Sequence, residues 1–300
     1  MFGADKSIAA FGEILWDVYP DKKRLGGAPF NFIYHIWKIF GKAKFISSVG
    51  NDSCGEEILA KLNSINFDTS LIIVDKEHPT GTVLVELDQN KTPRFTPTYN
   101  CSYDFLKLSD EFTKKLFDET ELLYFGTFSA RSEITRKTLS ALLNQPKLKY
   151  FCDLNLRHSF YSKELVEQAL SSSNVVKMND KELETLREMF RLPENDDAAC
   201  KALLNIFGIE LIGLTLGGNG AYLFGRDEQN YYKSIHTEVT DTLGAGDAFS
   251  AVLCLGYLKK MSLSMINKLA NEFALEVCKV NGALPDDSAY TKYISIFAGK

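Results

Sequence analysis

The chain has 300 residues, of which 45% are hydrophobic and 24% charged, a profile typical of a globular protein with one large or two smaller domains. Its net charge is -5, and the sequence contains no basic block. This charge distribution excludes the electrostatic footprint of a protein that binds nucleic acid or an anionic membrane. The longest apolar run, near residues 251–255, is far below the roughly 18 residues of a membrane helix, and we expect a cytoplasmic protein.

Short apolar runs alternate with helical patterns along most of the chain. Strands are predicted at 7–18, where the strand has an extension, and at 44–50, 121–128, 149–156, 174–178 and 210–217. Helices are predicted at 28–40, 53–65, 132–144, 163–171, 180–190 and 197–207. Such strand and helix pairs imply an α/β three-layer sandwich, with a mostly parallel central sheet and helices on both faces. No linker marks a domain boundary.

Residues 81–96 break this alternation, because two extended runs flank a polar turn at 88–91 with no helix between them. An antiparallel ribbon attached to a parallel sheet has little cover of its own. It is therefore a lid over a ligand, a surface for another subunit or a plain edge hairpin. A second, more ordinary ribbon is predicted at 221–235.

Glycine-rich turns occur at three places, namely Gly26-Gly27, residues 215–220 and residues 244–246. In an open parallel sheet, ligands bind beyond the carboxyl ends of the strands, where such turns gather. Together the three turns indicate one crevice that backbone approaches from several sides. None has the spacing of a Walker loop or of GxGxxG, which argues against a nicotinamide dehydrogenase.

The stretch DTLGAGDAFSAVL places Asp247 directly after three small residues and before an apolar helical run. In one interpretation the glycines form a turn and Asp247 stabilises the positive end of the helix dipole. In the other, bare backbone N–H groups form an anion site, and the neighbouring carboxylate accepts a proton. These residues alone leave both interpretations open.

DTLGAGDAFSA at 241–251, together with GGAPFN at 26–31, resembles the paired signatures of the ribokinase-like (PfkB) carbohydrate kinases. GEILWDVYP followed by GGAPFN is most similar to the fructokinases. The resemblance runs from Phe11 to about Ala283, with the motifs in the family's order. It implies a single kinase domain over residues 1–300, with a small β-sheet lid formed by segments near 13–25 and 81–98.

The implied activity is transfer of the γ-phosphoryl group of MgATP to a hydroxyl of a monosaccharide, with fructose as the closest match. Other acceptors remain open, namely 2-keto-3-deoxygluconate, ribose or a nucleoside. A catalytically idle sugar- or nucleotide-binding regulator also remains an alternative. The resemblance further implies a homodimer formed through the lid.

By resemblance, Asp247 is the base that takes the proton of the sugar hydroxyl. The backbone N–H groups of Gly244, Ala245 and Gly246 form the anion hole for the phosphoryl group in transfer. This assignment suits phosphoryl transfer, which requires mainly alignment and stabilisation of spread negative charge.

The implied sugar contacts are Asp17, Gly26, Gly27, Asn31 and Arg157. A carboxylate and a carboxamide suit a polyol, and glycines let it approach the main chain. The guanidinium suits contact with the substrate or the phosphates. Alternatives stay open for three of them: a solvated strand-end charge at Asp17, an exposed helix side at Asn31 and a surface salt bridge at Arg157.

On the nucleotide side, the resemblance assigns Asn179 and Glu182 to Mg²⁺ on the ATP phosphates, through water. A helix cap explains this pair equally well. The nucleotide turn and the wall of the adenine and ribose are implied at four further residues: Thr215, Gly217, Gly220 and Asn271.

The chain departs from the family pattern at Ile33, Tyr34 and Val252, where it carries bulkier residues than the usual small ones. The added volume shifts helix packing without touching the polar groups, so it bears mainly on which sugar is used. A monovalent cation such as K⁺ near Asp241 is typical of relatives, and the sequence leaves that cation open.

Overall fold

The computed structural model describes residues 6–87, 93–109, 113, 116–145, 147–235 and 238–298. Its largest element is a nine-stranded sheet, whose strands lie side by side as β13 (Gln229–Tyr232), β12 (Ala221–Gly225), β11 (Leu211–Thr215), β10 (Val175–Asn179), β9 (Lys149–Asp153), β8 (Thr120–Gly126), β1 (Ser7–Phe11), β4 (Ala43–Gly50) and β5 (Ile72–Asp75). All neighbours from β11 to β5 pair in parallel. In this sheet only β12 and β13 join antiparallel, and they form the second ribbon that was predicted at 221–235.

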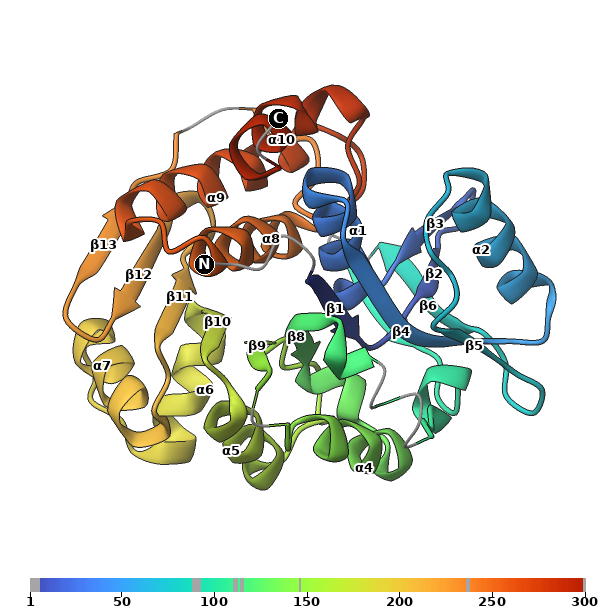
Figure 1. Ribbon diagram of the computed structural model, residues 1–300, viewed down its shortest axis with the longest axis horizontal. Coiled ribbons are helices and arrows are strands. Elements are labelled where there is room, and N and C mark those ends of the chain that lie inside the picture. The colour runs from blue at the N-terminus through green and yellow to red at the C-terminus, as the bar shows by residue number, and fades with distance from the viewer. Residues whose placement is uncertain are drawn as a thin grey trace.

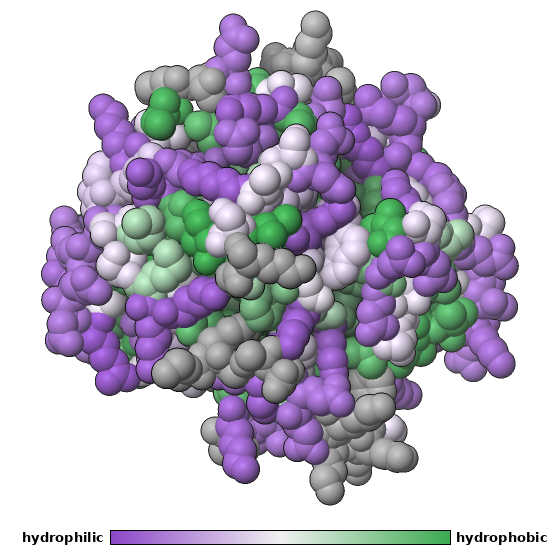
Figure 2. All heavy atoms as spheres, turned by 45° about the horizontal axis from the view of Figure 1, so that its top comes forward, coloured by the Kyte–Doolittle hydropathy of each residue, from purple (hydrophilic) through white to green (hydrophobic). Residues whose placement is uncertain are grey.

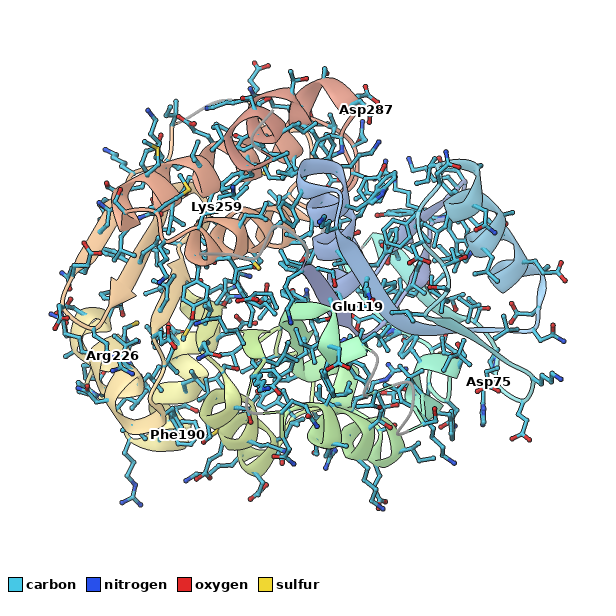
Figure 3. All side chains as sticks on the ribbon, viewed as in Figure 1. Asp75, Glu119, Phe190, Arg226, Lys259 and Asp287 are labelled. Atoms are coloured by element: carbon cyan, nitrogen blue, oxygen red, sulfur yellow. The ribbon has the colours of Figure 1, made fainter. Side chains whose placement is uncertain are left out.

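Helices cover both faces of this sheet (Figure 1). One layer holds α1 (Ala28–Phe40), α8 (Ala245–Leu258), α9 (Leu263–Cys278) and α10 (Thr291–Phe297), and α2 (Ser53–Ser64) packs into the same hydrophobic cluster. The other layer holds α4 (Glu133–Leu142), α5 (Lys163–Ser172), α6 (Asp180–Phe190) and α7 (Asp196–Phe207) over a second cluster. Figure 3 shows side chains filling the space between the sheet and these layers. The predicted three-layer α/β sandwich is confirmed.

The segment at 7–18, predicted as a strand with an extension, forms two strands in two different sheets. β1 ends at Phe11, and Gly12 turns the chain with a φ of 150°, where a side chain would collide with Ser129 and Pro29. The chain then enters the small sheet, ordered β3 (Lys23–Gly26), β2 (Leu15–Val18), β6 (Gly81–Leu87) and β7 (Pro93–Pro97). The predicted strand is therefore β1, and its predicted extension is the separate strand β2.

The small sheet unites the two segments that the family resemblance assigned to a lid. β2 pairs antiparallel with β3 but parallel with β6, and β6 pairs antiparallel with β7. The hairpin at 81–96 is thus present, although its predicted turn at 88–91 lies outside the described residues. Figure 1 shows this sheet beside the main sheet, with β2 following directly from β1.

The order of the main sheet fixes where a ligand can bind. From β1 the chain continues to β4 and β5 on one side and later to β8, β9, β10 and β11 on the other. The chain thus leaves β1 toward one side of the sheet and leaves β8 toward the other. This reversal is a topological switch point, and in parallel sheets ligands bind beyond the carboxyl ends of the two strands concerned. The small sheet leaves the main sheet at this same edge.

The surface matches the composition. Figure 2 shows hydrophilic residues over most of one face, with hydrophobic ones in small separate patches. In the described part of the chain, no helix combines the length and the apolar character needed to cross a bilayer. The six cysteines are free thiols, five of them buried and Cys54 partly exposed.

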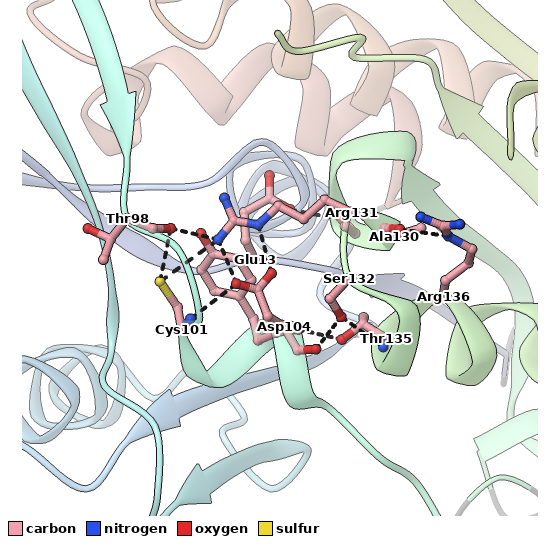
Figure 4. Close-up of polar contacts among 11 residues, drawn as sticks. Glu13, Thr98, Cys101, Asp104, Ala130, Arg131, Ser132, Thr135 and Arg136 are labelled. Atoms are coloured by element: carbon pink, nitrogen blue, oxygen red, sulfur yellow. Dashed lines mark hydrogen bonds and ion pairs between the residues drawn. The ribbon is translucent and has the colours of Figure 1, made fainter. Parts of the chain in front are cut away.

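A buried ion pair holds the connection that returns from the small sheet to β8 (Figure 4). The guanidinium of Arg131 donates to both carboxylate oxygens of Asp104 at 2.7 Å and to the carbonyl of Thr98 at 2.7 Å. The Arg131 and Asp104 side chains are only 4% and 6% exposed. The guanidinium also lies over the rings of Tyr103 and Phe128, at 5.0 and 4.8 Å. This geometry combines bidentate pairing with stacking, a task for which lysine is a poor substitute.

Asp104→Ala should strongly destabilise the protein, because it leaves the Arg131 charge buried without its carboxylate. We expect a loss of about 3–5 kcal/mol in the free energy of unfolding, measured by urea denaturation. Glu133→Ala is the matched control, since it removes the exposed Glu133–Lys137 pair and should cost under about 1 kcal/mol. Equal losses of unfolding free energy in the two variants would show that the buried Arg131–Asp104 pair stabilises the protein no more than an exposed pair.

Candidate active site

The first turn of α8 carries bare backbone amides. Gly244 is the N-cap residue with a φ of 79°, and a side chain there would collide with Ala283. No side chain caps this helix, and its first internal bond runs from the Ala248 N–H to the Gly244 carbonyl at 2.9 Å. Among the described residues, nothing accepts from the amides of Gly246 and Asp247. The positive end of the helix dipole is therefore open to an anion.

One predicted member of the anion hole is partly engaged. The amide of Ala245 donates to the carbonyl of Thr242 at 3.3 Å, which is a long hydrogen bond. The amides of Gly244 and Gly246 have no acceptor in the described ranges. The amides that are open to an anion are thus those of Gly244, Gly246 and Asp247 more than that of Ala245.

Asn31 orients the carboxylate of Asp247. Its Nδ2 donates to Asp247 Oδ2 at 2.8 Å, and the side chain reaches it from the first turn of α1. Asn31 is only 4% exposed, which excludes the exposed-helix-side interpretation. Its Oδ1 is buried and has no partner among the described residues. An unpaired buried acceptor is costly, so this oxygen is suited to receive a ligand hydroxyl.

The environment of Asp247 favours its neutral form. Burial raises the pKa of this carboxyl to about 7, and the negative charge of Asp153 acts in the same direction. The hydrogen bond from Asn31 and the charges of Lys177 and Arg157 oppose the rise. A base with a pKa near the working pH is well matched to proton transfer.

Sequence reasoning missed a buried ion pair below this helix turn. Lys177 Nζ lies 3.2 Å from Asp153 Oδ1, and the two residues are 7% and 2% exposed. A Cβ added to Gly246 would lie 3.0 Å from Lys177 Nζ, so the ammonium sits directly against the α8 turn. Asp153 Oδ2 also accepts from Ser250 Oγ at 2.9 Å and from the hydroxyl of Tyr124 at 3.3 Å. The available signal was a lysine inside an otherwise apolar strand.

The small sheet supplies the carboxylate of Asp17. This residue is 7% exposed, so the solvated strand-end interpretation is wrong. A side chain at Gly26 would collide with its carboxylate, and one at Gly27, where φ is 111°, would collide with the carbonyl of Glu13. Burial raises the pKa of Asp17 to about 6, against the positive charge of Arg24. Within the described residues no donor bonds this carboxylate, which leaves it available to a polyol.

Arg157 lies on the exposed loop after β9. Its Nε donates to Asn155 Oδ1 at 2.7 Å, and the described part of the chain gives it no ion pair. Its charge nevertheless lowers the pKa of Asp17, Asp247 and Glu13, so it acts electrostatically on all three carboxyls. A side chain held only by its own loop is free to reach a ligand.

Glu13 is a second carboxyl that sequence reasoning did not single out. It lies in the connection from β1 to β2, is 2% exposed and accepts from Ser129 Oγ at 2.9 Å. Burial raises its pKa to about 7. The sequence showed it only as part of a lid segment, because nothing local marks the residue as buried.

Asn179 and Glu182 form a reciprocal capping box at the start of α6. Asn179 Oδ1 accepts from the Glu182 amide at 2.9 Å, and Glu182 Oε2 accepts from the Asn179 amide at 2.8 Å. Glu182 Oε1 accepts from the amide of Leu156 at 3.0 Å. Each carboxylate oxygen of Glu182 thus accepts one backbone amide, and the helix cap that the sequence left open as an alternative is present. Among the described residues no cluster of three His, Cys, Asp or Glu side chains is suited to a metal.

The predicted nucleotide turn follows β11. Thr215 ends this strand opposite Asn179 of β10, at the same edge of the sheet. Gly217, with a φ of 55°, has open space where a side chain would be. Gly220 has a φ of 96°, and a side chain there would collide with the carbonyl of Tyr232. Gly220 thus requires glycine, whereas Gly217 has a left-handed φ that only favours glycine, and the turn leaves its outer surface clear.

Asn271 lies on α9, where its Nδ2 donates to the carbonyl and to the Oδ1 of Asn267 at 2.8 and 2.9 Å. Asn267 in turn donates to the carbonyl of Ala221 in β12 at 3.0 Å. The amide nitrogen of Asn271 is therefore used within the fold.

The carboxylate of Asp241 is surrounded by donors. Its Oδ1 accepts from the amide of Leu243 at 3.0 Å. Its Oδ2 accepts from the amide of Gly282 at 3.0 Å and from Arg24 Nη1 at 3.2 Å. A monovalent cation on this carboxylate would face the guanidinium of Arg24. The residues present do not fit the K⁺ that the family resemblance suggested here.

A parallel sheet with a switch point, and a carboxylate beside bare helix amides where its strands end, are features of a ribokinase-like fold with a candidate phosphoryl-transfer site. The family model of the pfkB family carbohydrate kinases matches residues 5–288. The chain belongs to this family and is a sugar kinase of the PfkB type.

Individual relatives match nearly the whole chain in sequence, and their solved structures match it in fold. The uncharacterized sugar kinase PH1459 of Pyrococcus horikoshii is 28% identical over 297 residues, covering 92% of this chain and 91% of that protein. Its structure in complex with ATP has a TM-score of 0.81 at 26% identity and covers 95% of this chain and 97% of that one. Fructokinase-1 of Zea mays is 27% identical over 277 residues, covering 85% of this chain and 84% of that protein.

A fructokinase double mutant of Vibrio cholerae, with fructose, ADP and a potassium ion bound, shares the fold with a TM-score of 0.77. It is 23% identical and covers 98% of both chains.

Lys177→Met should raise the pKa of Asp247, because it removes a positive charge that favours the ionised carboxylate. The acid limb of the pH dependence of kcat/KM reports this pKa and should move up by about one pH unit. Lys201→Met is the control, since Lys201 pairs with Asp197 on the exposed side of α7. An unmoved acid limb in Lys177→Met would mean that the ammonium does not act on this base.

Proposed function

We propose that this protein transfers the γ-phosphoryl group of ATP to a hydroxyl of a monosaccharide, with fructose as the first candidate. The observation that carries this proposal is the pairing of Asp247, whose pKa is about 7, with the bare amides of its own helix turn. Family membership supports a sugar as the acceptor. The choice of fructose rests on relatives of the fructokinase type at about 27% identity.

The chemical step follows from these groups. Asp247 accepts the proton of the sugar hydroxyl as its oxygen forms a bond to the γ-phosphorus. The bond from that phosphorus to the bridging oxygen breaks, and ADP leaves with the electron pair. The amides of Gly244 and Gly246 stabilise the charge on the moving group, and the ammonium of Lys177 adds to this below the turn.

ATP is the proposed donor, and the ATP complex of PH1459 supports this. We place the nucleotide along the ends of β10 and β11, with the turn from Gly217 to Gly220 against its phosphates and Asn271 near its adenosine. Mg²⁺ would neutralise charge on these phosphates when bound. Asn179 and Glu182 would hold such an ion through water, since Mg²⁺ keeps much of its hydration shell.

The small sheet is proposed as the lid over the sugar, since it carries Asp17 to the crevice. Its β6 strand exposes Leu84, which is 45% exposed, and Tyr99 beyond β7 is 64% exposed. These apolar side chains support a homodimer through the lid, as the family resemblance implies.

Acceptor choice is tested with a panel of fructose, glucose, ribose, 2-keto-3-deoxygluconate and adenosine, following ADP release from MgATP. We expect fructose to give the highest kcat/KM. A clear preference for adenosine would contradict the sugar assignment, whereas a preference for another sugar would change only the acceptor.

Asp247→Ala should abolish turnover while leaving ATP affinity nearly unchanged, because a positioned base contributes about 10²- to 10⁴-fold. Turnover is measured as ADP release and affinity by calorimetry with a non-hydrolysable ATP analogue. Glu133→Ala is the control, an acidic residue in the first turn of α4 that should change neither value. An Asp247→Ala variant within about tenfold of wild type would refute the base and favour a binding protein.

A further inference from the structure

We propose that Arg24 is a positioning residue whose fixed positive charge orders the loop before α8 and makes K⁺ unnecessary for turnover. The inference rests on the proposed function, because the loop in question carries the anion hole. It departs from the family resemblance, which suggested a monovalent cation near Asp241.

Arg24 reaches Asp241 from a different sheet. It lies on β3 of the small sheet, 217 residues away from Asp241 along the chain, and their side chains are 22% and 26% exposed. A partly exposed ion pair alone contributes little. Here the carboxylate also accepts the amides of Leu243 and Gly282, so one side chain holds three donors together. The guanidinium of Arg24 already neutralises the carboxylate charge that would attract a cation.

The position of Gly282 ties this cluster to the anion hole. Gly282 has a φ of 91°, and a Cβ there would lie 3.5 Å from Arg24 Cδ and Nη1, so the guanidinium lies against its backbone. The next residue, Ala283, packs so closely on Gly244 that a side chain on Gly244 would collide with it. Asp241 thus fixes Gly282, and Ala283 in turn supports the N-cap of α8.

Arg24 also serves the sugar side of the crevice. It lies opposite Asp17 in the register of β2 and β3, and its charge lowers the pKa of that carboxyl. The guanidinium carbon lies 5.3 Å from the ring centre of Tyr19, which limits where the group can move. One cation therefore faces the carboxylate that binds sugar and the carboxylate that orders the anion hole.

A bound K⁺ and a guanidinium at Asp241 exclude each other by charge and by space. The guanidinium carries its charge covalently, so it needs no ion from solution and moves with the small sheet. Loss of Arg24 should loosen the 241–244 loop and leave Asp241 free to accept a soluble cation.

The test compares wild type, Arg24→Ala and Arg24→Lys with MgATP and the best acceptor, at constant ionic strength. Tetramethylammonium chloride is replaced stepwise by KCl up to about 150 mM, or guanidinium chloride is added at about 10 mM. We expect wild type to change less than about twofold. Arg24→Ala should lose about 10- to 100-fold in kcat, less than the about 10²- to 10³-fold of a removed anion-hole donor because Arg24 acts through the loop, and should regain several-fold with K⁺ or guanidinium. Arg24→Lys should retain most of the turnover.

Arg187→Ala is the matched control, because Arg187 also pairs with an aspartate, Asp196, but on the outer helix layer. It should show neither the loss nor the response to cations. Activation of wild type by K⁺ of tenfold or more would overturn the proposal. A variant Arg24→Ala that keeps full kcat, or that loses kcat and responds to neither cation, would overturn it as well.

A second readout separates this inference from the proposed function. Affinity for a non-hydrolysable ATP analogue is measured by calorimetry in the same buffers, which requires no turnover. If wild type phosphorylates no sugar, the proposed function fails. A nucleotide affinity that changes with K⁺ in Arg24→Ala but not in wild type would still support the role proposed for Arg24. Equal changes in both proteins would overturn that role.

Discussion

The structure depends on an uncapped helix N-terminus placed where parallel strands end. In the part of the chain that the structure describes, the first turn of α8 presents amides without acceptors, and no side chain caps it. Such an end is favourable only if an anion completes it or neighbouring groups hold it in place. Ala283 packs against Gly244, and Lys177 lies against Gly246. The surrounding loops thus keep an anion site open that an ordinary cap would close.

The charges around this turn form a balanced set. Asp153, Lys177 and Asp247 lie together, where burial opposes every isolated charge. Burial and the charge of Asp153 raise the pKa of Asp247, while the Lys177 ammonium opposes the rise. The result is a carboxyl that titrates near neutral pH, and this property belongs to the cluster rather than to any one residue.

The small sheet contributes a second group of charged side chains, which links it to the loop before α8. Asp17 and Arg24 lie opposite each other on β2 and β3, and Arg24 continues to Asp241 on the main domain. The buried Arg131–Asp104 pair holds the returning connection of this sheet. Displacement of the small sheet would therefore disturb Asp17 and the α8 loop together.

The sequence by itself determined most of the helices and strands and the GAGD turn, because each depends on local spacing: Pro29 opens α1, and glycines stand where φ is positive, as at Gly244 and Gly220. It also indicated the family through motifs that are contiguous along the chain. Only the tertiary structure separated β1 from β2, turned Asn31 toward Asp247 and brought Arg24 to Asp241 across 217 residues. The physical reason is that burial, register and long-range charge arise from how sheets and helices pack, and local residue patterns do not encode these distances.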